Sequence, residues 1–338
     1  MFGFKPVFII AVLLLGGTGF SVSAQNRFAP AFVLETSFKA KEVYPVPKDA
    51  RILIIPHHLV AGREIASLLA STPAPKNVFL LSPDHFSSGE EFLTTDSIRQ
   101  ADEHGIHGLV PFIEQAWPGA QIVPAMLRID TPTGTRLEIT QKISSELIRT
   151  PDSILIATID FSHYLPVFAA DFHDEYSADM IRSLSCDKAY TIELDAPGIF
   201  EIACMTARRL GLAPTIHANT NSLSLMKAEI AQDSTSHFLV SFSPGAPAER
   251  QTKTTFISPP GKWVSAENRL EYGFDARMDL DLDMDLAIGM VESSQHTILY
   301  FMPHKTTDQG HVLLTGSERM KRLSELGLPG SGVVTLLK

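Results

Sequence analysis

The sequence predicts an α/β domain in which helices cover both faces of a mainly parallel β-sheet. Short runs rich in Ile, Val and Leu, bounded by Pro or Ser, are typical of strands that are buried on both faces. Longer segments between these runs repeat their apolar residues at helical spacing. Because strands and helices alternate along the chain, successive strands are expected to be parallel. This pattern covers residues 50–248.

In chain order, the domain is expected to contain five strands and five helices. The strands are Ile52–Pro56, Val78–Ser82, Gln121–Leu127, Ile154–Ile159 and His237–Phe242. The helices are Gly62–Ala70, Gly108–Trp117, Arg136–Arg149, Asp171–Leu184 and Ala196–Leu210. Pro111 is tolerated only in the first turn of its helix. Asp195 is the expected N-cap of the last helix, and Gly211 is its expected end.

Residues 1–24 are expected to be an export signal that is cleaved after Ala24. Lys5 precedes the apolar run Pro6–Leu15, and Val22-Ser23-Ala24 matches the small-x-small cleavage pattern. The run is short for a membrane-spanning helix, which needs about 20 residues. We therefore expect an exported protein, periplasmic or extracellular, that is attached to a membrane only if the signal stays uncleaved.

Two further segments flank the α/β domain. The polar residues 25–49, punctuated by proline, are expected to form an extended arm. Residues 262–338 are expected to form a small α+β extension. Within it, Met278–Leu286 alternates as a strand with one solvated acidic face does, although the same face could bind a cation. A further strand at Ile298–Met302 and a helix at Ser317–Leu326 complete the extension.

The charge of the chain argues against two classes of partner. Its 28 Lys and Arg against 38 Asp and Glu give a formal net charge of −10, and the sequence has no cluster of Lys or Arg. Nucleic acids and anionic membranes are bound through such clusters, so neither is an expected partner. The expected ligand is a small molecule or a peptide of unidentified chemistry.

Histidines stand where three of the expected strands end. His57, His85 and His163 follow the strands that begin at residues 52, 78 and 154, and Asp84 and Asp160 lie beside two of them. In open α/β sheets, ligands bind at the edge formed by the carboxyl ends of the strands. The three imidazoles are therefore expected at one edge of one sheet, an arrangement that predicts a metal site.

The chain has two cysteines, Cys186 and Cys204. In an oxidising compartment the two could form a disulfide. Cys204 also lies on the apolar stripe of an expected helix, where a cysteine is often only a small hydrophobic residue. The residues themselves leave open whether Cys204 is a free thiol.

Five short motifs occur in order between about residues 50 and 243. They are Pro56-His57, Ser82-Pro83-Asp84-His85, Glu103-His104-Gly105-Ile106-His107-Gly108-Leu109-Val110-Pro111-Phe112, Asp160-Phe161-Ser162-His163 and, more weakly, Cys204. They resemble Pro-His-Ala-Gly, Gly-Pro-x-His, Glu-His-Ser-Leu-Glu-x-x-Leu-Pro-Phe, Ser-Asp-x-Ser-His and Cys-Gly of the Memo family, whose bacterial members are called AmmeMemoRadiSam system protein B. The chain departs from that pattern at Met205, which replaces a Gly, and at His107, which replaces a Glu. His107 is an extra ligand, a sign of a different substrate, or an ordinary loop residue.

The resemblance implies a fold similar to that of class III extradiol dioxygenases, with a metal pocket. It implies metal ligands at His57, His85 and Cys204, and catalytic or outer-shell groups at His104, Asp160 and His163. Imidazole and thiolate suit iron, copper or zinc rather than magnesium or calcium, and iron or copper is expected rather than zinc. Two functions stay open, because a fold does not fix a function. One is a dioxygenase-like, metal-dependent oxidoreductase, and the other is a non-catalytic scaffold that binds metal or a peptide.

Overall fold

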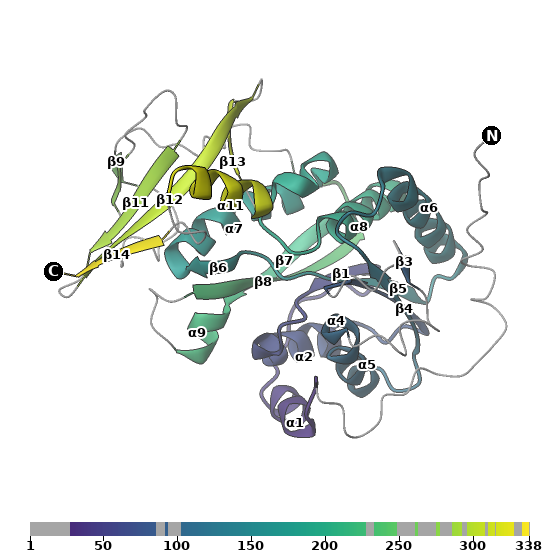
Figure 1. The fold of residues 1–338 in the computed structure, drawn as a ribbon. Helices are drawn as coiled ribbons and strands as arrows, with labels where there is room; N and C mark the ends of the chain where they lie inside the picture. Colours follow the sequence, from purple (N-terminus) through teal and green to yellow (C-terminus); the bar gives the residue numbers. More distant parts are fainter. Residues whose placement is uncertain are drawn as a thin grey trace, which may run out of the picture. The chain divides into compact units, whose positions relative to one another are not determined.

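Figure 1 shows the computed structural model of the chain. It describes residues 28–85, 92–93, 103–227, 233–248, 261–262, 275–277, 286–292, 296–307, 310–314, 316–327 and 333–337. The chain forms two units, each assembled from several stretches of sequence. The first unit holds the residues up to Ile159 together with Gly198–Ala218 and Phe238–Ala246. The second unit holds Asp160–Pro197, Asn219–His237 and the residues from Pro247 onward.

A mainly parallel sheet forms the centre of the first unit. Its four inner strands follow the order β4 (Gln121–Leu127), β2 (Asn77–Pro83), β5 (Ser153–Thr158) and β1 (Ile52–Ile55), and each neighbouring pair is parallel. The short β3 (Phe92–Leu93) is antiparallel to β4, and the carboxyl-terminal half of β8 (Asp233–Pro244) is antiparallel to β1. β7 (Leu212–Asn221) also pairs with β8. The fold class predicted from the sequence is confirmed.

Helices lie on both faces of this sheet (Figure 1). On one face are α1 (Ala31–Lys39), α2 (Gly62–Ser71), α4 (His104–His107) and α5 (Val110–Ala116), and on the other are α6 (Thr133–Arg149) and α8 (Pro197–Leu210). A single-turn 3₁₀ helix, η2 (Leu59–Ala61), leads into α2. Pro111 occupies the first turn of α5, as expected. Gly211 ends α8 at φ +63°, a backbone conformation that favours glycine.

The core of the first unit lies between the sheet and α2, α4 and α5. Wholly buried Leu53 and Ile55 of β1 and Leu80 of β2 pack there with Ile65 of α2 and Phe112 of α5. Burying a side chain of this size contributes roughly 1.5–3 kcal/mol relative to exposure. This core therefore fixes the two strands, β1 and β2, that lead to the first two histidines.

One expectation for the N-terminal part is wrong. The segment expected to be an extended arm contains the helix α1, in which Val33, Leu34 and Phe38 pack against the core of the first unit. The Phe38 ring lies 6.0 Å from the ring of Phe112, centroid to centroid. The helix forms because its apolar face is buried against the neighbouring elements, and local sequence does not reveal that surface.

The second unit contains a strand, β6, that pairs with β8, and a separate antiparallel sheet. β6 (His163–Pro166) runs antiparallel to the N-terminal residues of β8 and is followed by α7 (Val167–Arg182), η3 (Cys186–Thr191) and, later in the chain, α9 (Ser222–Met226). The antiparallel sheet contains β9 (Gly261–Lys262), β10 (Asp275–Arg277), β11 (Leu286–Glu292), β12 (His296–Thr307), β13 (Gly310–Leu313) and β14 (Val333–Leu337). The helix α11 (Gly316–Glu325) packs against β12.

The expected C-terminal strand and helix are both present, as β12 and α11. The acidic segment from Met278 to Asp285 lies outside the described residues. The boundary expected between residues 248 and 262 stays a prediction. Within the part of the chain that the structure describes, no helix combines the length and apolarity needed to cross a membrane.

Candidate metal centre

Two strands on either side of β5 bring the first two histidines to the same edge of the sheet. β1 ends two residues before His57, and β2 ends two residues before His85. Both strands are parallel to β5, which lies between them, so their carboxyl ends reach the same edge of the sheet. His57 is buried, with 3% of its surface exposed, while the His85 side chain is 27% exposed. The site is therefore buried on the His57 side and accessible on the His85 side.

A short helix supplies a third imidazole. Glu103 is the N-cap of α4, and its side chain accepts a hydrogen bond from the backbone N–H of Gly105 at 2.8 Å. His104 is the first helical residue, and its side chain is 36% exposed. The cap fixes the start of the helix, so it also fixes the direction in which His104 leaves the backbone.

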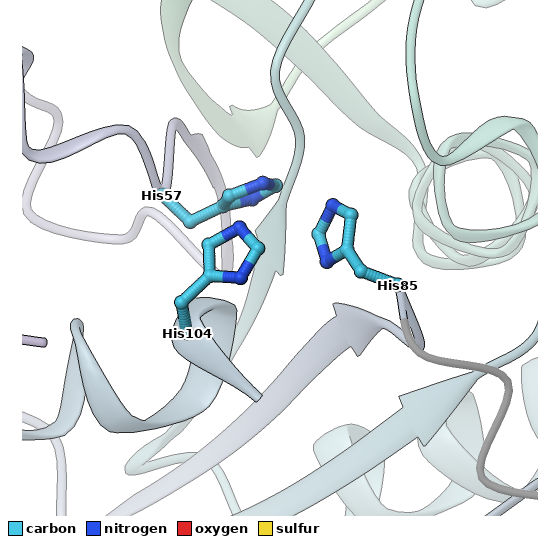
Figure 2. A group of neighbouring side chains, drawn as sticks. All are labelled: His57, His85 and His104. Atoms are coloured by element: carbon cyan, nitrogen blue, oxygen red, sulfur yellow. The ribbon is translucent and has the colours of Figure 1, made fainter. Parts of the chain in front are cut away.

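Figure 2 shows the three rings facing one another. The ring centroids of His57 and His85 are 4.9 Å apart, those of His57 and His104 are 5.0 Å apart, and those of His85 and His104 are 4.3 Å apart. One nitrogen from each ring can be chosen so that all three lie within 4.8 Å of one another.

These separations fit a shared metal ion. Metal–imidazole bonds of about 2.0–2.1 Å place two nitrogens on one ion at most about 4.2 Å apart. In tetrahedral or trigonal geometry the nitrogens lie about 3.3–3.6 Å apart, so nitrogens up to 4.8 Å apart would need to approach by up to about 1.5 Å through side-chain rotation. Imidazole nitrogens suit zinc, copper, iron and nickel, so the donor set also fits a transition metal.

Glu103 lies beside the Nδ1 atoms of the two partly exposed histidines, His85 and His104. Its Oε1 lies 2.9 Å from His85 Nδ1 and 3.3 Å from His104 Nδ1, and its Oε2 accepts the backbone N–H of His85 at 3.1 Å. Burial alone would raise the pKa of this carboxyl, which is 1% exposed. The hydrogen bond and charge of His85, with the N–H groups of Gly105 and His85, outweigh burial and lower the pKa. Glu103 is therefore an anion at neutral pH.

Cys204 does not supply the thiolate that the resemblance implied. Cys186 and Cys204 are both disulfide-bonded, and the sequence has no other cysteine. A disulfide sulfur carries no thiolate charge, and it is the thiolate that binds metals. The third group beside His57 and His85 is instead His104, which the motif match had assigned an acid–base or outer-shell role.

Asp160 and His163 belong to the second unit. The backbone N–H of Asp160 donates to Asp195 Oδ1 at 3.1 Å, and the Asp160 carbonyl accepts the backbone N–H of Asp195 at 3.0 Å. His163 begins β6 and pairs with Thr235 of β8. Their expected roles beside a metal stay predictions.

His107 lies on α4 with His104, and the Phe28 ring lies beside both, 6.5 Å from the ring of His104. The His107 ring stacks on Phe28, with centroids 6.1 Å apart and an interplanar angle of 17°. Among the described residues, the grouping of three imidazoles consists of His57, His85 and His104. The role of Glu103 was missed from the sequence. The available signal was an acidic residue directly before a histidine at the start of a helix.

Comparison with known families agrees with the two motifs that the match covers, Glu103–Phe112 and Asp160–His163. A family model described as Memo-like protein matches residues 86–193, a stretch that contains Glu103, His104, Asp160 and His163. No match was found among curated proteins. Over residues 86–193 the chain is similar to the Memo-like protein family.

Proposed function

We propose that this Memo-like chain is a metal-binding protein in which His57, His85 and His104 hold one divalent transition-metal ion. The observation that carries the proposal is the convergence of three imidazoles, with one nitrogen of each within 4.8 Å of the others. Carboxylates, carbonyls and water would be the expected ligands for magnesium or calcium. A site built from imidazoles therefore argues for iron, copper or zinc, and we favour iron or copper.

Three protein ligands leave a coordination position free for water or a small molecule, which is the arrangement of catalytic rather than structural metal sites. The exposure of His85 and His104 supports access to that position. A bound ion would supply Lewis acidity and, if it is iron or copper, electron transfer. We propose a redox role toward dioxygen or a small aromatic compound, with Asp160 and His163 as proton-handling groups.

Metal content tests the binding proposal. The wild-type protein and the variants His57→Ala, His85→Ala and His104→Ala are purified without oxygen, and bound metal is measured by plasma mass spectrometry. We expect close to one ion per wild-type chain and loss of the ion from each variant. His107→Ala is the matched control, because His107 lies on the same helix but outside the group of three imidazoles. Wild-type stoichiometry in both His57→Ala and His85→Ala would contradict the proposal.

Oxygen consumption separates a redox enzyme from a scaffold. Protein loaded with ferrous or cuprous ion is mixed with small catechols in an oxygen electrode. A redox enzyme consumes oxygen in step with the aromatic compound, and Asp160→Asn and His163→Ala slow that reaction without releasing the metal. A protein that keeps its metal but consumes no oxygen with either ion is a binding scaffold.

A further inference from the structure

We propose that Glu103 is a positioning residue that sets the tautomers of His85 and His104 together, so that both present Nε2 to the metal. This inference rests on the proposed metal site and names the group that organises it. Glu103 reaches both rings from one buried carboxylate, although it neighbours only one of these histidines in sequence.

The contacts of Glu103 account for each of its oxygen atoms. Oε1 faces His85 Nδ1 at 2.9 Å and His104 Nδ1 at 3.3 Å, and it also accepts the backbone N–H of Gly105 at 2.8 Å. Oε2 accepts the backbone N–H of His85 at 3.1 Å. Every neighbour in this set is a donor or a ring nitrogen that can become one.

Both Glu103 oxygens accept backbone N–H groups, as those of a carboxylate do, and a group that only accepts hydrogen bonds requires the ring nitrogens that face it to carry hydrogen. A neutral imidazole has a single N–H and a single nitrogen lone pair. If Nδ1 carries the hydrogen in His85 and His104, the lone pair of each ring is on Nε2. The two rings are then set to bind a metal before any metal arrives, and only their Nε2 atoms are available.

Burial makes this control effective. The Glu103 side chain is 1% exposed, so water does not compete for its oxygens. The backbone bonds from Gly105 and His85 hold the carboxylate independently of the two rings. His85 follows β2 and His104 begins α4. Glu103 therefore links two elements that are separated along the chain. Carboxylates that orient metal-binding histidines in this way typically affect metal affinity by about 10–100-fold.

The first test needs neither metal nor a variant. Long-range ¹H–¹⁵N correlation spectra of the metal-free protein, recorded at a pH where imidazoles are neutral, report which ring nitrogen carries hydrogen. We expect the Nδ1–H form for His85 and His104. If either wild-type ring is predominantly the Nε2–H form, the inference is overturned.

The second test uses Glu103→Gln, which keeps the shape of the side chain but replaces one acceptor oxygen with an NH₂ donor. The amide cannot satisfy two ring N–H groups and two backbone N–H groups at once, so we expect at least one of the two rings to change tautomer while His57 keeps its own. The affinity for Co²⁺, followed by its visible absorption, should fall about 10–100-fold. Glu103→Asp retains both acceptor oxygens and should recover part of the loss.

Controls separate this role from a general loss of structure. Glu138→Gln changes an exposed glutamate on α6 and should leave both the tautomers and Co²⁺ affinity unchanged. A Glu103→Gln protein that is less stable but keeps wild-type tautomers and Co²⁺ affinity would overturn the inference. If the wild type shows the expected tautomers but binds no metal, the tautomer control by Glu103 stands and the proposed metal function fails.

Discussion

Gly105 on α4 lies so close to Ser82 on β2 that a methyl group at residue 105 would overlap the Ser82 hydroxyl. Ser82 is itself fully buried near the end of the strand that leads to His85. The contact therefore presses the start of α4, with Glu103 and His104, against that strand. A residue without a side chain is required at the point where the two halves of the site meet.

Gly105→Ala is expected to damage both the fold and the site. The added Cβ would have to displace Ser82 or move α4, and overpacking of this kind typically costs about 1–3 kcal/mol of unfolding free energy. Because α4 carries Glu103 and His104, the affinity for Co²⁺ should fall as well. Urea unfolding and Co²⁺ titration measure the two effects on the same protein.

A second substitution and a control identify the cause. Ser82→Ala removes the overlapping hydroxyl, so the double variant should be more stable than Gly105→Ala alone, with a coupling energy that a double-mutant cycle reports. Gly134→Ala on α6 has open space around its new methyl group and should be neutral or more stable by about 0.4–1 kcal/mol. Equal losses at both glycines would show that glycine replacement, rather than the Ser82 contact, is responsible.

Much of the α/β fold follows from local patterns in the sequence. The run Ile154–Ile159 predicted a strand that the structure places at Ser153–Thr158, because apolar β-branched residues buried on both faces leave a clear signal. β7 was not predicted. Its residues from Ala213 to Thr220 are only half-buried or exposed, and Pro214 interrupts the run, so neither periodicity nor composition marks a strand there.

The candidate site was only partly predictable for a related reason. His57 and His85 were placed together because the parallel strands of one sheet end at one edge, which is a rule of topology. The position of His104 depends on how α4 packs against β2, and no sequence rule supplies that contact. Cys204 was misassigned because the order of motifs along a chain does not fix which side chains meet in space.

Export of the protein is a prediction that the N-terminal sequence of the secreted form can check. A basic residue, an apolar run of signal-peptide length and Val22-Ser23-Ala24 together favour cleavage after Ala24. When the full chain is expressed in a bacterial host, the periplasmic protein should begin at Gln25. Replacing Ala24 with a bulky residue such as Phe should cause the uncleaved precursor to accumulate. A cytoplasmic protein that retains residue 1 would contradict export.

Single cysteine variants discriminate between the two roles considered for Cys204. A disulfide is disrupted equally by Cys186→Ser and Cys204→Ser, so both should lose a similar amount of unfolding free energy, about 3 kcal/mol for a loop of this size. Both should also keep the metal, because neither sulfur is a thiolate in the native protein. If Cys204 were a ligand, only Cys204→Ser would lose the ion, and Cys186→Ser would resemble the wild type. Metal analysis and urea unfolding of the two variants therefore give opposite patterns for the two roles. The mass of the non-reduced wild-type protein, two hydrogens below that of the reduced form, reports independently whether the bond is present.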